Sequence, residues 1–101
     1  MIMTKIEVTQ VAEREISKLK NYSYEELSAL ESCESKRITV RGKSMVLTVW
    51  KDAVENHQIR VVVQIYRHFF LGIGQMHSQG FLMNSKKEIV DLQRNELYEF
   101  T

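Results

Sequence analysis

The chain has 101 residues, of which 44% are hydrophobic and 27% are charged. These shares match ordinary globular domains and exclude a disordered acidic tail or a collagen-like repeat. No uninterrupted apolar run is long enough to cross a bilayer, and the first residues lack the apolar stretch of a signal peptide. We therefore expect a soluble cytoplasmic protein that binds no membrane.

The absence of proline and the presence of only four glycines argue against linkers and against a second domain. No internal repeat is visible in the sequence. We expect one domain over residues 1–101, with a helical part at about 8–32, a sheet part at about 36–92 and a tail at 93–101.

The net charge of +1 is unevenly distributed. Residues 1–35 hold seven Glu against four Lys or Arg, a net of −3, whereas residues 36–83 hold seven basic side chains against two acidic ones, a net of +5. A basic middle segment can face phosphates, or it can face the acidic helices of its own chain. The second explanation is favoured, because oppositely charged segments of one small domain usually meet as surface pairs.

Apolar residues at helical spacing predict a first helix that ends near Lys20. Thr9 is a candidate N-cap for it. Ile6 and Val8 also fit a short strand, so the sequence leaves the start of this helix open. The apolar stripe consists of Val8, Val11, Ala12, Ile16 and Leu19.

A capping box predicts a second helix. Ser23 and Glu26 have the spacing at which each side chain accepts the backbone N–H of the other residue. Tyr22 and Leu27 occupy the two positions of a hydrophobic staple. We expect this helix to run from about Tyr24 to Ser32.

From Lys36 onward the hydrophobic period changes from helical to two, which predicts strands. Glycines at 72, 74 and 80 interrupt the fourth run and predict a bulge or bend there. From Asp91 the tail is expected to close with a turn of helix that buries Leu97 and Phe100. The expected strands are 37–41, 45–51, 58–69, 70–83 and 88–92, with a polar loop at 52–57 and a hairpin turn at 84–87.

Short connections between consecutive strands require antiparallel neighbours. Helices followed by a run of strands are typical of α+β folds. The predicted fold is therefore α+β, with the two N-terminal helices packed on one face of a four- to five-stranded antiparallel meander and a short C-terminal helix.

No motif indicates an enzyme, a cofactor or a metal. Gly72-Ile73-Gly74 is only half of a dinucleotide fingerprint and precedes strand-like sequence, so a β-bulge is the better interpretation. His57, His68 and His77 lack the spacing of zinc ligands. Cys33 is the single cysteine, so no intramolecular disulfide forms, and its position near a helix C-terminus predicts an inert thiol.

One face of the 58–69 strand carries the candidate binding residues. If Ile59, Val61, Val63 and Ile65 face the helices, the alternate residues share the other side of the sheet. Trp50 joins them if the 45–51 strand turns the corresponding face outward, and Lys51 is a further candidate. The predicted binding surface consists of Trp50, Arg60, Gln64, Tyr66 and His68.

Three functions fit this surface. Exposed aromatic and apolar residues favour a non-catalytic interaction module that binds a protein partner or a second copy of itself. Aromatic rings among basic side chains also suit RNA or single-stranded DNA. Metal-independent RNA cleavage by histidine, tyrosine and arginine is the weakest of the three. Phe69 and Phe70 point to opposite faces, so a helix covers one of them and the other needs a second cover. The tail residues Leu97, Tyr98 and Phe100 or a second copy of the chain can supply it.

Overall fold

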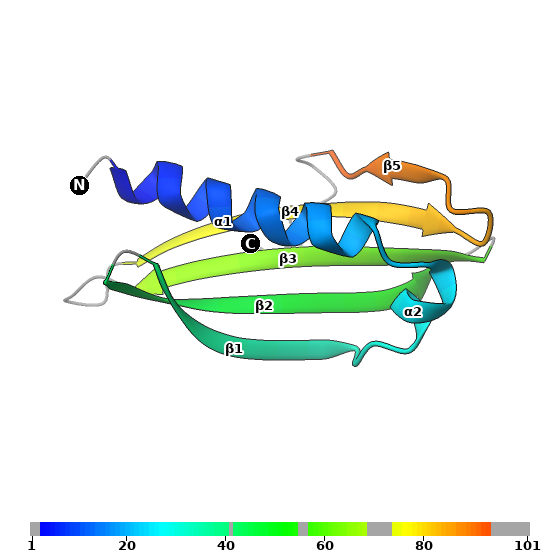
Figure 1. Cartoon of the computed structure of the whole chain (residues 1–101), viewed down its shortest axis with the longest axis horizontal. Helices are drawn as coiled ribbons and strands as arrows, with labels where there is room; N and C mark the ends of the chain where they lie inside the picture. Colours follow the sequence, from blue (N-terminus) through cyan, green and yellow to red (C-terminus); the bar gives the residue numbers. More distant parts are fainter. Residues whose placement is uncertain (1–2, 41, 55–56, 69–73, 94–101) are drawn as a thin grey trace.

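The computed structural model describes residues 3–40, 42–54, 57–68 and 74–93. Helix α1 (Met3–Lys20) and the short helix α2 (Tyr24–Ser28) precede five strands. These are β1 (Cys33–Val40), β2 (Lys43–Val54), β3 (Gln58–His68), β4 (Gly74–Asn84) and β5 (Ile89–Asp91). The strands form one sheet in chain order, and both helices lie on the same side of it (Figure 1). The predicted α+β fold with an antiparallel meander is confirmed.

Helix α1 begins five residues earlier than the first apolar residue of its stripe. Val8, Ala12, Ile16 and Leu19 are all buried, as the helical spacing predicted. The alternative strand at Ile6 and Val8 is wrong, because Val8 packs one turn before Ala12 on the buried face. Thr9 lies inside the helix and is not its N-cap.

The capping box of α2 forms as predicted. Ser23 Oγ accepts the Glu26 backbone N–H at 3.1 Å, and Glu26 Oε1 accepts the Ser23 N–H at 2.8 Å. The helix ends at Ser28, four residues earlier than expected. The residues at and after its end bond to the sheet instead. Lys51 Nζ donates to the Ser28 carbonyl, and the Lys51 backbone N–H donates to the Ser32 carbonyl. Residues from Cys33 onward therefore pair with β2 instead of continuing the helix.

The first two strands are longer than the sequence indicated. Strand β1 starts at Cys33 and not near Lys36, and β2 extends into the expected polar loop as far as Val54. Asp52 lies directly opposite Arg60, and their ion pair extends the β2–β3 ladder beyond the apolar run. The 84–87 turn and the strand after it are confirmed, with β5 pairing antiparallel to β4.

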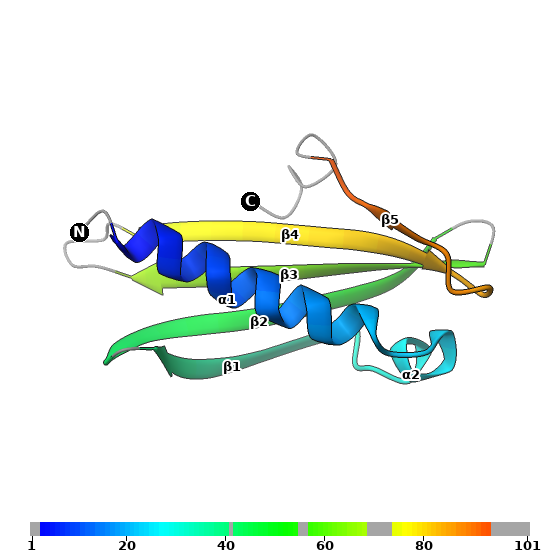
Figure 2. The same cartoon turned by 45° about the horizontal axis from the view of Figure 1, so that its top comes forward.

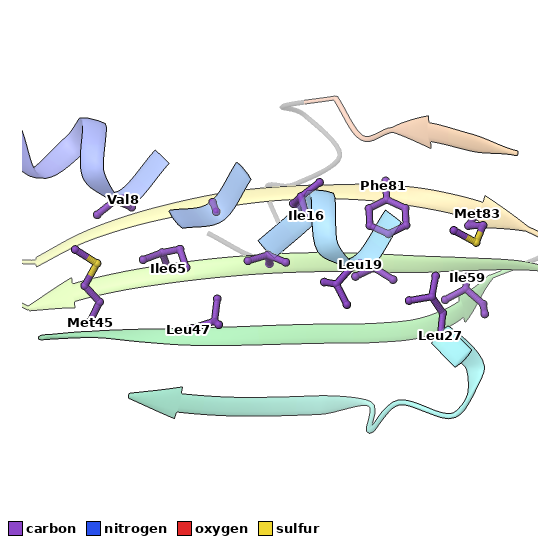
Figure 3. Packing of buried hydrophobic residues seen from close by; sticks show 13 residues of the cluster. Val8, Ile16, Leu19, Leu27, Met45, Leu47, Ile59, Ile65, Phe81 and Met83 are labelled. Atoms are coloured by element: carbon purple, nitrogen blue, oxygen red, sulfur yellow. The ribbon is translucent and has the colours of Figure 1, made fainter. Parts of the chain in front are cut away.

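The core lies between α1 and the sheet (Figure 2 and Figure 3). Ile59, Val61, Val63 and Ile65 all face the helices, as predicted, and each is buried. Lys20, in the last turn of α1, pairs with Asp91 at 2.6 Å and so ties the helix to β5. The same ammonium lies 5.9 Å from the ring centroid of Phe81, at a distance typical of a cation–π contact. From the sheet, Met45, Leu47, Phe81 and Met83 complete the buried cluster.

Gly80 does not form a bulge or a bend. The β3–β4 register runs without interruption from Gln58 opposite Asn84 to His68 opposite Gly74. Glycine is required for a different reason, which is close approach of other groups. A Cβ at this position would lie 2.7 Å from the Val61 carbonyl oxygen and 2.8 Å from Leu92 Cδ1. Gly80 thus makes room for Leu92, whose N–H donates to the Gly80 carbonyl.

Asp91 is the last residue of β5, and the expected turn of helix in the tail after it falls on residues 94–101, outside the described residues. Leu97, Tyr98 and Phe100 lie outside the described residues, as do Phe69, Phe70 and Gly72. Within the described part of the chain, no helix is long and apolar enough to span a membrane.

The close approach at Gly80 predicts that Gly80→Ala destabilises the protein. The added methyl must displace backbone or Leu92, which should lower the free energy of unfolding by about 1–3 kcal/mol. Urea denaturation followed by circular dichroism measures this change.

Ser78→Ala is the matched control, on the same face of β4 two residues away. The Ser78 hydroxyl is buried and has no hydrogen-bond partner. Its removal should therefore leave stability unchanged or raise it by about 1 kcal/mol. Equal stability of Gly80→Ala and the wild-type protein would contradict the close packing described here.

Candidate interaction surface

The sheet face opposite α1, which we call the outer face, has a regular arrangement of side chains. Directly paired residues of antiparallel strands lie on the same face, so the register defines which side chains are neighbours. Trp50 lies between Cys33 and Val62, and Val46 lies between Arg37 and Tyr66. Between these two rows, a polar row crosses the sheet and consists of Ser35, Thr48, Gln64 and Ser78.

Trp50 and Gln64 form the best-defined contact of the outer face. The indole Nε1–H donates to Gln64 Oε1 at 2.6 Å. Gln64 is only 9% exposed, whereas Trp50 keeps 38% of its surface in solvent. The buried amide thus holds the ring in one position and leaves apolar ring surface exposed.

Arg60 shares the outer face, but its charge is neutralised within the sheet. Its Nε and Nη2 atoms donate to the two carboxylate oxygens of Asp52 at 3.0 and 2.6 Å. This two-point geometry is the strong form of an arginine–carboxylate pair. Arg60 is therefore engaged with its own chain at the point where the sequence suggested a phosphate contact.

Tyr66 lies opposite Val46 and is half-buried. The structure thus brings Trp50, Arg60, Gln64 and Tyr66 to one face. His68 occupies the last position of β3, and its side chain lies outside the described residues. Lys51, the further candidate, does not belong to this surface: it lies on the helix side, where its ammonium donates to the Ser28 carbonyl at 3.0 Å.

Two members of the middle polar row bond each other. Ser35 Oγ and Thr48 Oγ1 are 2.8 Å apart and share a hydrogen bond. Val62, next to this row, is only 1% exposed and lies outside the main core cluster. We define the Trp50 patch as Ser35, Arg37, Val46, Thr48, Trp50 and Tyr66, the outer-face residues of β1, β2 and β3 beside this covered centre.

The basic residues of the middle segment do not collect on the outer face. Because successive residues of a strand point to opposite faces, these basic side chains are divided between the two sides of the sheet. Arg37 and Arg60 belong to the outer face, whereas Lys36, Lys43, Lys51 and Arg67 occupy positions of the helix side. The net charge of +5 predicted from the sequence is thus divided and does not form one basic surface.

The histidines are also dispersed. His57 lies in the β2–β3 connection with a φ of 55°, and His77 lies on the helix side, where its Nε2 is 2.9 Å from Gln79 Nε2. Among the described residues, no group of three His, Cys, Asp or Glu side chains is placed to hold a metal ion. Cys33 is exposed as the first residue of β1.

A groove that the sequence did not indicate lies on the helix side, between α1 and the first two strands. It has a volume of about 240 Å³. Leu19, Leu47 and Val49 line it together with the charged side chains of Glu34 and Lys36. The groove exists because α1 lies over β3 and β4 and leaves β1 beyond its reach (Figure 2), a placement that hydrophobic periodicity does not encode.

Comparisons with models of protein families, with curated proteins and with solved structures found no match. The protein's fold and its surface define an α+β meander with an aromatic residue anchored on its outer face.

The Trp50–Gln64 contact predicts the effect of Gln64→Met, which preserves side-chain size and removes the acceptor. Loss of a hydrogen bond in a part-buried site should lower the free energy of unfolding by about 1–2 kcal/mol. The released indole should also become more accessible to acrylamide, measured as quenching of Trp50 fluorescence.

Gln79→Met serves as the control, because Gln79 lies on the helix side and bonds His77. It can change stability but should leave the quenching of Trp50 as in the wild-type protein. If Gln64→Met also leaves the quenching unchanged, the amide does not position the indole.

Proposed function

We propose that the protein is a non-catalytic interaction module that buries the Trp50 patch against the surface of a protein partner. The observation that carries this proposal is the hydrogen bond between the indole N–H of Trp50 and the buried amide of Gln64. A partner needs to supply only apolar contact, since the polar atom of the ring is already paired within the chain.

An anchored tryptophan favours binding energetically. Binding hot spots are enriched in tryptophan, and they lose little entropy when the free protein already holds the side chain in place. Thr48 and Ser35 beside the ring satisfy each other, so covering them leaves few unpaired groups. Arg37 stands at the margin, where a charge serves to orient a partner.

Nucleic-acid binding through the same face is the second candidate. The exposed ring of Trp50 and the charge of Arg37 support it, because base stacking and phosphate contacts use these groups. The Asp52–Arg60 pair argues against it, since a phosphate would have to displace a two-point carboxylate contact. RNA cleavage has less support, because Arg60 is already paired with Asp52 and the side chain of His68, the histidine of this hypothesis, lies outside the described residues.

The proposal predicts that Trp50→Ala weakens protein binding. Ligands selected from a displayed peptide or small-domain library against the wild-type chain should lose affinity at least about tenfold on this variant. Val90→Ala is the matched control, because Val90 is 60% exposed on the same face at the far strand β5. Ligands insensitive to Trp50→Ala, or sensitive to both changes, would contradict the proposal.

The nucleic-acid alternative is tested by titrating single-stranded RNA and following Trp50 fluorescence at about 50 and 200 mM salt. Phosphate contacts release counterions, so binding by this route weakens steeply with salt. The proposal predicts no salt-sensitive quenching. Quenching that disappears at the higher salt, and is lost in Arg37→Glu, would favour nucleic acid over a protein partner.

A further inference from the structure

Strand β1 forms an edge of the sheet and carries features of a pairing surface. It is eight residues long and pairs with β2 in an unbroken register, from Cys33 opposite Trp50 to Val40 opposite Lys43. In both views β1 borders the sheet, with no described element beyond it (Figure 1 and Figure 2). A long exposed edge without proline is a template for another strand.

A backbone hydrogen bond beside β1 shows which of its backbone groups turn outward. The Ser32 carbonyl accepts from the Lys51 N–H at 2.9 Å, in the same register as the rest of the ladder. In an antiparallel pair the residues that bond the neighbour alternate with those that do not. Glu34, Lys36 and Ile38 therefore bond β2, and Cys33, Ser35, Arg37 and Thr39 direct their N–H and C=O groups away from the sheet.

Two of the three charged side chains of β1, one acidic and one basic, lie on the same side of the strand. Glu34 and Lys36 lie opposite Val49 and Leu47, on the helix side, and both are exposed. Neither has an ion-pair partner among the described residues. Ser35 lies between them in the sequence.

We propose that β1 pairs antiparallel with β1 of a second copy, centred on Ser35, and joins the two sheets into one of ten strands. In this register Glu34 of each chain lies opposite Lys36 of the other, and the two Ser35 residues face each other. Cys33 lies opposite Arg37. The outward N–H and C=O groups of Cys33, Ser35 and Arg37 then form about six backbone hydrogen bonds.

Charge selects this register over its neighbours. A two-fold axis perpendicular to the sheet pairs only residues of the same face, so each symmetric register is centred on one residue. Centres at Glu34, Lys36 or Arg37 place that charge against its own copy. A centre at Ile38 leaves Lys36 opposite Val40, without a carboxylate. Only the Ser35 centre cancels both charges on the helix side of each strand.

The groove on the helix side gives the pairing a second consequence. Glu34 and Lys36 line this groove, so the same residues that face each other across the axis lie at its border. Pairing therefore places the grooves of the two copies side by side, with the crossed ion pairs between them. The edge interface uses the backbone of β1 and its helix-side charges, so it shares only Ser35 and Arg37 with the Trp50 patch on the outer face.

Exchange of charges tests the pairing. Glu34→Lys alone and Lys36→Glu alone should each weaken dimerisation at least about tenfold, because like charges then lie directly opposite. An equimolar mixture of the two variants should restore the dimer, since every Lys then faces a Glu. The doubly exchanged chain E34K/K36E should dimerise as the wild-type chain does. Sedimentation velocity over a concentration series measures all four.

A disulfide trap tests the centre of the register. In a Cys33→Ser background, Ser35→Cys places two thiols at directly paired positions, within the Cα separation that a disulfide requires. Mild oxidation should produce a covalent dimer. Thr39→Cys in the same background is the control, because the register places it opposite Glu31 of the other copy, and it should remain uncrosslinked.

A wild-type chain that stays monomeric throughout the series overturns the proposal, as does a mixture that fails to restore the dimer. A dimer that tolerates both single exchanges but is lost in Trp50→Lys would also overturn it. That last result would place the second copy on the outer face and leave the proposed function intact. Conversely, a charge-dependent dimer in which library ligands ignore Trp50→Ala would support edge pairing and contradict the proposed function.

Discussion

Burial of β3 on both sides is the constraint from which the rest of the structure follows. Five consecutive residues, Val61 to Ile65, are buried, although they alternate between the helix side and the outer face. A strand covered on both faces cannot shift by one residue, because Gln64 would then enter the core and Val63 would leave it. The register of β3 therefore fixes the facing of β2 and β4, and through β2 that of β1.

This register explains why the outer face combines a polar row with an anchored aromatic ring. Gln64 is buried at the centre of the sheet, so its amide requires a nearby hydrogen-bond partner. Trp50, on the neighbouring strand β2, donates its indole N–H to the amide oxygen of Gln64. The same contact serves stability and presentation of the ring, and this is why the Trp50 patch is more than scattered apolar surface. Leu92, which packs over Gly80 on this face, adds to the cover of its centre.

Much of the fold was predictable because its signals are local and periodic. The capping box of Ser23 and Glu26, the helical stripe from Val8 to Leu19 and the alternation along β3 each depend on neighbours in the chain. The errors arise where a distant partner decides. Helix α2 stops at Ser28 because Lys51 bonds its last carbonyl and the following residues pair with β2. Strand β2 continues past Lys51 because Arg60 pairs with Asp52.

The candidate site shows the same division. Alternation placed Arg60, Gln64 and Tyr66 on one face of β3, and the register of β2 then decided that Trp50 joins them and Lys51 does not. Sequence could not show that Arg60 is neutralised by Asp52, since the expected loop at 52–57 removed that carboxylate from the sheet. It also could not show the groove beside β1, which depends on where α1 crosses the sheet.

The edge strand illustrates how topology turns a charge pattern into a specific surface. In a meander that follows chain order, the first strand is necessarily an edge. Helix α2, which precedes this strand, lies on the same side of the sheet as α1. Protection against indiscriminate pairing then depends on side-chain charge, for which a run of one sign on one face would be the most effective device. Glu34 and Lys36 instead have opposite signs on one face. Such a pair disfavours the registers centred on either charge and is complementary to itself when the centre is Ser35. Because a symmetric antiparallel pair reverses the strand, a positive and a negative charge at equal distances from Ser35 are brought into contact twice.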